Sequence, residues 1–154
     1  HLKPHFKSHP GQYVTADLES PLADLHFDVQ QIPLADGSVD VVICNHIMEH
    51  VADDRRAMRE LHRGLKPGGW GIVLSPVDRD YEQTYEDDSI TDPDERTRIF
   101  GQYDHRRIYG ADYADRLRQA GFQVADIDYA ATFTEAERRL YALPADHMYV
   151  VYKV

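Results

Sequence analysis

The stretch Asp36-Gly37-Ser38-Val39-Asp40-Val41-Val42-Ile43-Cys44-Asn45-His46 decides the fold. Its first three residues favour a turn, and residues 39–44 form a compact apolar run broken only by Asp40. A short, β-branched apolar run bounded by turn residues is typical of a strand buried on both faces, as in a parallel sheet. In open α/β sheets, ligands bind beyond the carboxyl ends of such strands. Asn45 and His46 therefore lie where a binding site is expected.

A helix and a second buried strand follow this stretch. Asp53 or Asp54 can cap a helix whose apolar positions recur at helical spacing, namely Met58, Leu61 and Leu65. Pro67-Gly68-Gly69 is expected to end the helix, and residues 70–75 are expected to form the next strand. The order strand, helix, strand predicts a right-handed parallel crossover.

The flanking sequence extends this unit on both sides. Residues 13–17 and 25–29 resemble short strands that precede it. After it we expect a helix, a strand, a capped helix and a last strand, over residues 111–120, 122–129, 134–143 and 148–153. Helices that alternate with apolar strands indicate the α/β class, with helices on the faces of a sheet.

Two segments are expected to be irregular. Residues 1–12 contain Pro4, Pro10 and Gly11, which oppose a stable helix, so they are treated as an irregular N-terminus. Residues 77–108 are rich in acids at first, are long for a connection and lack helical periodicity up to Phe100. Because such long connections are commonly functional, we expect this segment to form a lid over a site. Residues 1–154 are interpreted as one domain.

Composition excludes several classes of protein. No apolar run approaches the roughly 20 residues that cross a bilayer, and no signal peptide is visible, so no membrane partner is expected. The single cysteine, Cys44, cannot form a disulfide within the chain, which fits a reducing cytoplasm. The net charge of −10 opposes binding to phosphate backbones, so a nucleic-acid partner is disfavoured.

Three spaced pieces of the sequence carry a resemblance to a known family. They are Asp28-Val29-Gln30-Gln31-Ile32-Pro33-Leu34-Ala35-Asp36-Gly37-Ser38-Val39-Asp40-Val41-Val42, then Glu49-His50-Val51, then Glu60-Leu61-His62-Arg63-Gly64-Leu65-Lys66-Pro67-Gly68-Gly69. Together they resemble the class I S-adenosylmethionine-dependent methyltransferases of the type 11 group, closely from Tyr13 to Leu74. The resemblance implies a Rossmann-like fold: a three-layer, doubly wound, mostly parallel sheet with an antiparallel last strand. It also implies S-adenosylmethionine as cofactor, and we expect a small-molecule acceptor.

The resemblance further implies cofactor-binding roles for residues at strand ends. Asp17 would accept hydrogen bonds from the ribose hydroxyls, and Leu18 would pack on the adenine. Asp28 would accept from the adenine amino group, and the Val29 amide would reach a ring nitrogen. Asn45 would lie beside the methionine portion. The alternative for both aspartates is a turn-forming acid at the end of a strand.

His46 and His50 are the candidate catalytic residues. Methyl transfer can require a base that removes the proton of the acceptor, and histidine titrates near neutral pH. The alternative for His50 is a packing role at the start of a helix. The two histidines are four residues apart, but with Glu49 between them the order is not H-E-x-x-H, so no metal site is expected.

A second polar cluster supplies candidate acceptor-binding residues. Tyr103, His105, Arg106 and Tyr109 follow the acidic segment and combine aromatic with hydrogen-bonding groups. The alternative for His105 and Arg106 is that they are solvated partners of the acids before them.

The N-terminus departs from the pattern of the family. The family's first strand and glycine-rich loop would precede Tyr13, yet residues 1–12 contain no G-x-G pattern. We therefore expect an N-terminally truncated domain, which alone binds the cofactor weakly or not at all. The strands at 13–17 and 39–44 would each keep an unpaired edge, which direct pairing of the two or a homodimer could cover. The alternative function is a non-catalytic methyltransferase-like remnant that serves as an interaction or dimerisation module.

Overall fold

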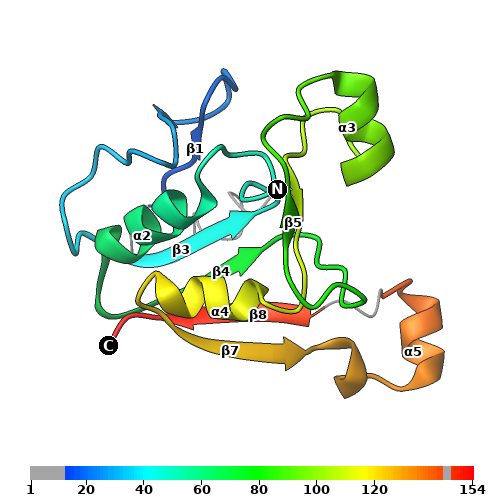
Figure 1. Cartoon of the computed structure of the whole chain (residues 1–154). Coiled ribbons are helices and arrows are strands. Elements are labelled where there is room, and N and C mark those ends of the chain that lie inside the picture. Colours follow the sequence, from blue (N-terminus) through cyan, green and yellow to red (C-terminus); the bar gives the residue numbers. More distant parts are fainter. Residues whose placement is uncertain (1–12, 144–146) are drawn as a thin grey trace.

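The computed structural model describes residues 13–143 and 147–154 (Figure 1). Its centre is a four-stranded sheet in the order β3-β4-β8-β7, and the irregular terminus expected at 1–12 lies outside the described residues. The strands are β3 (Val39–Asn45), β4 (Leu65–Leu74), β7 (Gln123–Asp128) and β8 (His147–Tyr152). β3 and β4 are parallel, whereas β8 is antiparallel to both of its neighbours. The expected mostly parallel sheet with a reversed last strand is confirmed.

The unit β3-α2-β4 forms as its sequence predicts. Helix α2 (Asp54–Gly64) begins after Asp53, whose carboxylate accepts a hydrogen bond from the Arg56 amide at 2.8 Å. β4 begins at Leu65, earlier than expected, so Pro67-Gly68-Gly69 lies within the strand instead of ending the helix. The reason is a pairing distant in sequence: backbone hydrogen bonds join Gly68 and Gly69 to Lys153 at 2.7 and 3.0 Å.

The core lies between this sheet and two helices on one of its faces. α2 contacts α4 (Tyr113–Gln119), which also packs against β7. Position 71 in β4 requires a glycine, because a Cβ there would overlap Val42 of the neighbouring strand β3. The buried side chains include Met58, Leu61, Val73, Leu117 and Val151. The opposite face of the sheet leaves Val41, Ile43, Trp70 and Tyr152 exposed.

Two short strands lie outside the main sheet. β1 (Ala16–Asp17) and β2 (Leu25–His26) form a separate two-stranded parallel sheet. Both strands are shorter than the five residues expected at 13–17 and 25–29. Local hydrogen bonds shape this part, since the Asp24 carboxylate accepts from both the amide and the hydroxyl of Thr15 at 2.9 and 2.7 Å.

Residues 77–108 are more ordered than expected, although much of the segment remains outside helices and strands. They contain β5 (Tyr85–Glu86), α3 (Pro93–Phe100) and β6 (Arg107–Ile108), and β5 pairs with β6 in antiparallel fashion. Asp92 caps α3 by accepting from two amides, and Gly101 ends it with a φ of 88°. Glycine reaches this left-handed conformation without strain.

The C-terminal part completes the layer order. A short 3₁₀ turn, η1 (Ala130–Thr132), precedes α5 (Glu135–Leu140), and Thr134 and Glu137 form the expected capping box. In Figure 1, β3, β4 and β7 point in one direction, and α3 and α5 lie toward the end to which they point. None of the helices in the described ranges is long and apolar enough to cross a membrane.

Candidate functional site

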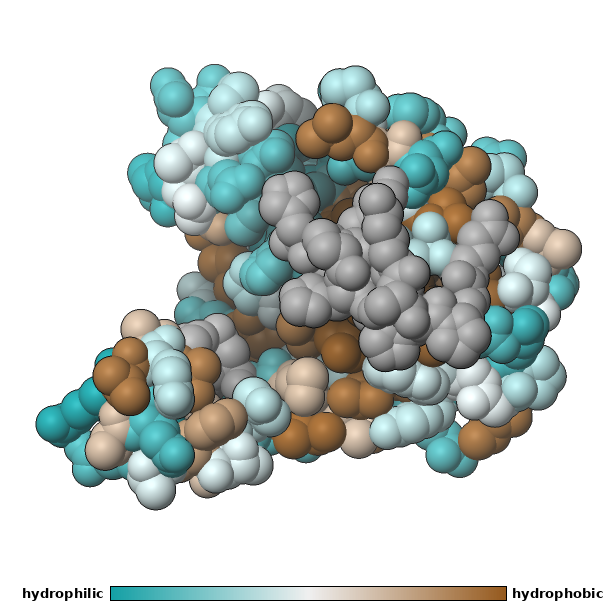
Figure 2. Space-filling view, turned by 180° about the vertical axis from the view of Figure 1, so that it is seen from behind, coloured by the Kyte–Doolittle hydropathy of each residue, from teal (hydrophilic) through white to brown (hydrophobic). Residues whose placement is uncertain are grey.

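A cavity of about 380 Å³ opens beyond the carboxyl ends of β3 and β4. His46 and Glu49 come from the turn after β3, and Ser75 follows β4 directly. Phe100 and His105, near the end of α3, form another wall, and His147 of β8 lies on a third side of the cavity. Figure 2 shows the surface hollowed between the lobes that carry α3 and α5. The cavity therefore lies where an open α/β sheet places its ligand.

His46 lines the cavity, and its backbone has an uncommon conformation. Its φ is 54°, and its amide donates to the carbonyl of Leu74 at 2.8 Å, which fixes the turn to the end of β4. Its side chain is 66% exposed, with Nδ1 3.3 Å from Glu49 Oε1. A non-glycine residue in the left-handed region costs free energy, and such residues cluster at functional sites.

Glu49 is a buried carboxylate that the sequence analysis did not assign to the site. Its side chain is only 2% exposed, and its Oε2 accepts from the Ser75 hydroxyl at 2.8 Å. Its Oε1 faces both His46 and His50 Nε2, the latter at 4.0 Å. A buried carboxylate is costly without partners. Glu49 therefore depends on Ser75 and the two histidines, and its contacts hold these side chains near the cavity. The available sequence signal was its position between two histidines.

The structure brings the two predicted polar clusters together. The Arg106 amide donates to the Glu49 carbonyl at 2.9 Å, which joins the second cluster to the turn after β3. The rings of His50 and His105 meet edge to face, with centroids 4.8 Å apart. His50 Nδ1 also lies 3.2 Å from Asp104 Oδ2. His46, His50 and His105 thus share one site, although His50 does not line the cavity.

Tyr109, which was predicted to bind the acceptor, lies in the core of this structure. Its side chain is fully buried, and its hydroxyl is 3.0 Å from the Met48 carbonyl and 2.9 Å from Asp54 Oδ2. Burial raises the pKa of Tyr109 well above its ordinary value. Of the other predicted residues, Tyr103 is exposed and Arg106 pairs with Asp88 at 3.4 Å, so neither lines the cavity.

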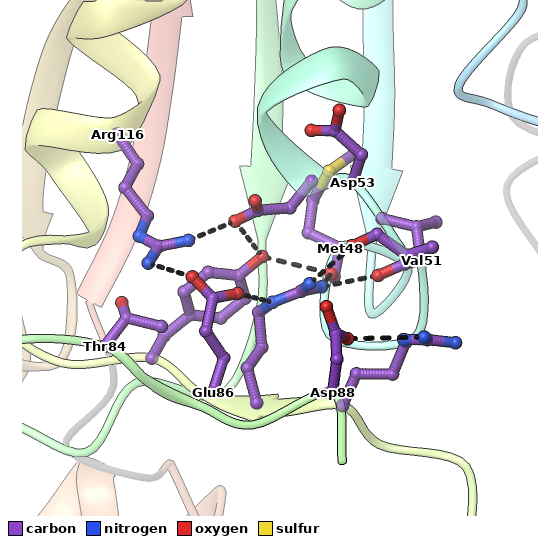
Figure 3. A network of polar contacts seen from close by, with 12 residues as sticks. Met48, Val51, Asp53, Thr84, Glu86, Asp88 and Arg116 are labelled. Atoms are coloured by element: carbon purple, nitrogen blue, oxygen red, sulfur yellow. Dashed lines mark hydrogen bonds and ion pairs between the residues drawn. The ribbon is translucent and has the colours of Figure 1, made fainter. Parts of the chain in front are cut away.

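A buried ionic network fixes the strands β5 and β6 to the turn after β3 (Figure 3). Arg107 donates to three backbone carbonyls of that turn and to Glu86, which lies 3.0 Å from its Nε. Arg116 of α4 joins Glu86 to Asp54 at 2.8 Å each. Burial raises the pKa of the Glu86 carboxyl, but hydrogen bonds from Arg116 and Arg107 outweigh it and hold the pKa below 4.5. No local pattern in the sequence indicates this network, because its members are distant in sequence.

A third polar group lies on the far wall of the cavity. Arg79 donates to Asp126 at 2.8 Å and to the Tyr149 hydroxyl at 3.2 Å. His147 Nδ1 lies 2.5 Å from the same aspartate. Burial raises the pKa of Asp126, yet the hydrogen bonds from Arg79 and His147 lower it overall. These residues were also missed, since they come from three separate elements.

The residues predicted to hold the cofactor do not line this cavity. Asp17 Oδ1 accepts from the amides of Glu19 and Ser20 at 2.9 and 2.8 Å, and these bonds lower the pKa of Asp17. Asp28 Oδ1 accepts from the Gln30 amide at 2.8 Å. Both aspartates therefore order turns after strand ends. Leu18, Val29 and Asn45 complete the predicted set; Leu18 and Asn45 are exposed and Val29 is half-buried.

Comparison with known proteins identifies the matching family. Residues 4–73 match the family model described as a methyltransferase domain. A probable S-adenosylmethionine-dependent methyltransferase of Mycolicibacterium smegmatis is 31% identical over 107 residues, which are 69% of this chain and 37% of that protein. A demethylmenaquinone methyltransferase of Staphylococcus epidermidis is 38% identical over 64 residues, 42% of this chain and 26% of that protein.

A solved structure agrees with the family match. An S-adenosylmethionine-dependent methyltransferase from Mesorhizobium loti superimposes with a TM-score of 0.57 at 16% identity, over 88% of this chain and 76% of that one. The fold is therefore that of the Rossmann-like methyltransferases. In sequence and in fold the chain is therefore similar to S-adenosylmethionine-dependent methyltransferases. It spans only about a third of the length of the curated relatives it matches.

Proposed function

We propose that the protein transfers a methyl group from S-adenosylmethionine to a small-molecule acceptor bound in the cavity between α3 and α5. The observation that supports this proposal is the cavity itself, which lies at the carboxyl ends of β3 and β4 in a methyltransferase fold. Its volume of about 380 Å³ is in the range of small-ligand sites. Its walls combine the phenyl ring of Phe100 with imidazole and carboxylate groups.

The donor would bind beside the cavity, at the ends of β1, β2 and β3. Asp17 and Asp28 supply carboxylates, which accept hydrogen bonds from hydroxyl and amino groups. Leu18 is 63% exposed and offers an apolar surface to an adenine ring. Val29 and Asn45 complete the proposed set. This arrangement would place the donor's methionine portion near the turn that carries His46.

The reaction is a displacement at the methyl carbon. A lone pair of the acceptor forms the new bond to carbon while the carbon–sulfur bond breaks, which releases S-adenosylhomocysteine. The protein contributes by holding the two reactants in line. His46 is the candidate catalytic residue that faces the acceptor, since its exposed side chain lines the cavity. His50 is directed toward Glu49 and Asp104, so we propose a positioning role for it.

Methyl transfer can be tested by the release of S-adenosylhomocysteine with a panel of phenol, amine and thiol acceptors. His46→Ala should lower turnover by on the order of 10²-fold while the affinity for the donor stays nearly unchanged. Arg118→Ala is the control, because Arg118 pairs with Asp115 on the surface of α4 and belongs neither to the cavity lining nor to the proposed donor site. Equal turnover in wild type and His46→Ala would remove His46 from the mechanism.

A second candidate function is an interaction or dimerisation module. It is supported by the edge position of β3 in the described sheet and by the exposure of Val41 and Ile43 on it. An exposed apolar edge strand can pair with another chain. Sedimentation equilibrium separates the two proposals. A concentration-dependent dimer that Ile43→Lys abolishes, together with no release of S-adenosylhomocysteine, would favour the module.

A further inference from the structure

Three side chains of the types that bind metals in proteins lie close together at the wall of the cavity. One ligand atom each from Glu49, His50 and His105 lies within 4.8 Å of the other two. Glu49 and His50 come from the turn after β3, and His105 comes from the loop between α3 and β6. The network at Arg107 and the hydrogen bond from the Arg106 amide to the Glu49 carbonyl hold these two segments together. The cluster is therefore built by long-range contacts.

Each histidine of the cluster has an acceptor beside its Nδ1. His50 Nδ1 lies 3.2 Å from Asp104 Oδ2, and His105 Nδ1 lies 3.2 Å from the Phe100 carbonyl. An acceptor at Nδ1 places the ring proton there and leaves Nε2 as a ligand atom. Glu49 has the same arrangement, because Ser75 donates to its Oε2 and its Oε1 faces His50 Nε2.

A cation fits the charge of this cluster. His50 Nε2 lies 4.0 Å from Glu49 Oε1, so an ion between the two groups can contact both after a small rotation of the side chains. The Glu49 side chain is only 2% exposed, and a buried carboxylate is costly unless it has a partner of opposite charge. The two orienting acceptors at Nδ1 are the partners that metal-binding histidines generally have.

We propose that Glu49, His50 and His105 bind a divalent transition-metal ion such as Zn²⁺. Two imidazoles and one carboxylate form a set that suits Zn²⁺ and leaves a coordination position open. Bonds of about 2.0–2.2 Å require the ligand atoms to approach by on the order of 1 Å, which side-chain rotation allows. Because Glu49 and His105 line the cavity, a ligand bound there could reach the ion. This set differs from the His46 and His50 pair considered in the sequence.

The test is direct binding of Co²⁺, followed by its visible absorption, with Zn²⁺ as competitor. The background variant carries His1→Ala, His5→Ala and His9→Ala, because those histidines could bind metal independently. We expect the background protein to bind one equivalent of Co²⁺, and we expect Zn²⁺ to displace the bound Co²⁺. His105→Ala should lower the affinity by more than tenfold, and Asp104→Asn by about tenfold. His26→Ala, a histidine in the separate sheet, should leave the affinity unchanged.

Thermal unfolding supplies a second readout that separates loss of a ligand from loss of the fold. Zn²⁺ should raise the melting temperature of the background protein and not that of His105→Ala. If His105→Ala does not fold, Glu49→Gln, which preserves the shape of the side chain, replaces it with the same expectation. Failure of the background protein to bind Co²⁺ saturably, or equal affinity in the ligand variants, would overturn the proposal. Neither readout requires methyl transfer, so the two proposals fail separately.

Discussion

Arg107→Ala tests whether the ionic network fixes the cavity wall. The Arg107 side chain is 2% exposed and donates to the carbonyls of Met48, Val51 and Ala52 at 2.7, 2.7 and 3.0 Å. After truncation, Met48 keeps the Tyr109 hydroxyl, whereas the structure gives the other two carbonyls no replacement donor. An unsatisfied buried acceptor costs about 1–3 kcal/mol, and water can reach the exposed Ala52.

The contribution of the ion pair to this loss is small. Glu86 is 42% exposed and keeps its bond to Arg116, so its separation from Arg107 adds little. The expected decrease in the free energy of unfolding is therefore about 1–3 kcal/mol, mostly from the Val51 carbonyl in the turn after β3. Urea unfolding followed by circular dichroism measures it. Hydrogen exchange at residues 48–52 should accelerate in parallel.

Arg118→Ala is the matched control. Its guanidinium pairs with Asp115 at 2.7 Å on the surface of α4, with both side chains about half exposed or more. Removal of such a pair should change the free energy of unfolding by less than about 0.5 kcal/mol. The reasoning would be refuted if Arg107→Ala cost no more than Arg118→Ala, or if exchange at residues 48–52 stayed unchanged.

Two further predictions concern a thiol and a carboxylate. Burial, followed by the charge of Glu49, raises the pKa of Cys44 to about 12. A disulfide reagent at about pH 8 should therefore leave the folded protein unmodified and label one thiol after unfolding in urea, and rapid labelling of the native state would contradict this burial. The pKa of Glu86 is held below 4.5 in the folded state, so its stabilisation is present above pH 4.5 and is lost as the pH falls through the folded value. The difference in urea midpoint between wild type and Glu86→Gln should shrink from about pH 6 to about pH 3, and a constant difference would count against the network.

Sequence reasoning succeeded where local signals agreed. The run of apolar residues in β3, the cap at Asp53 and the apolar stripe of α2 all lie within short windows, so their structure could be predicted. α3 was missed because it is polar and buries only Phe100, which leaves no apolar periodicity. Its cap at Asp92 and its stop at Gly101 were nevertheless readable in the sequence.

The site was predicted less completely than the fold for the same physical reason. His46 and His105, two of the predicted site residues, line the cavity, since both follow structural elements at its rim. Glu49, Arg107 and Arg116 were not predicted because their partners are distant in sequence, and only the tertiary structure shows that they are buried. The burial of Tyr109 was likewise not predicted, since it stands among polar residues in the sequence but lies in the core.

The central claim is that the ends of β1, β2 and β3 form one donor site beside the cavity. An amide NMR titration of the ¹⁵N-labelled chain with S-adenosylhomocysteine tests it most directly, because chemical shifts report weak as well as tight binding. We predict concentration-dependent shifts at the amides of Asp17, Asp28 and Asn45 and at their neighbours, and none in α5. We expect Asp28→Ala to reduce all of them together. An absence of shifts at saturating ligand, or shifts confined to other elements, would contradict the account.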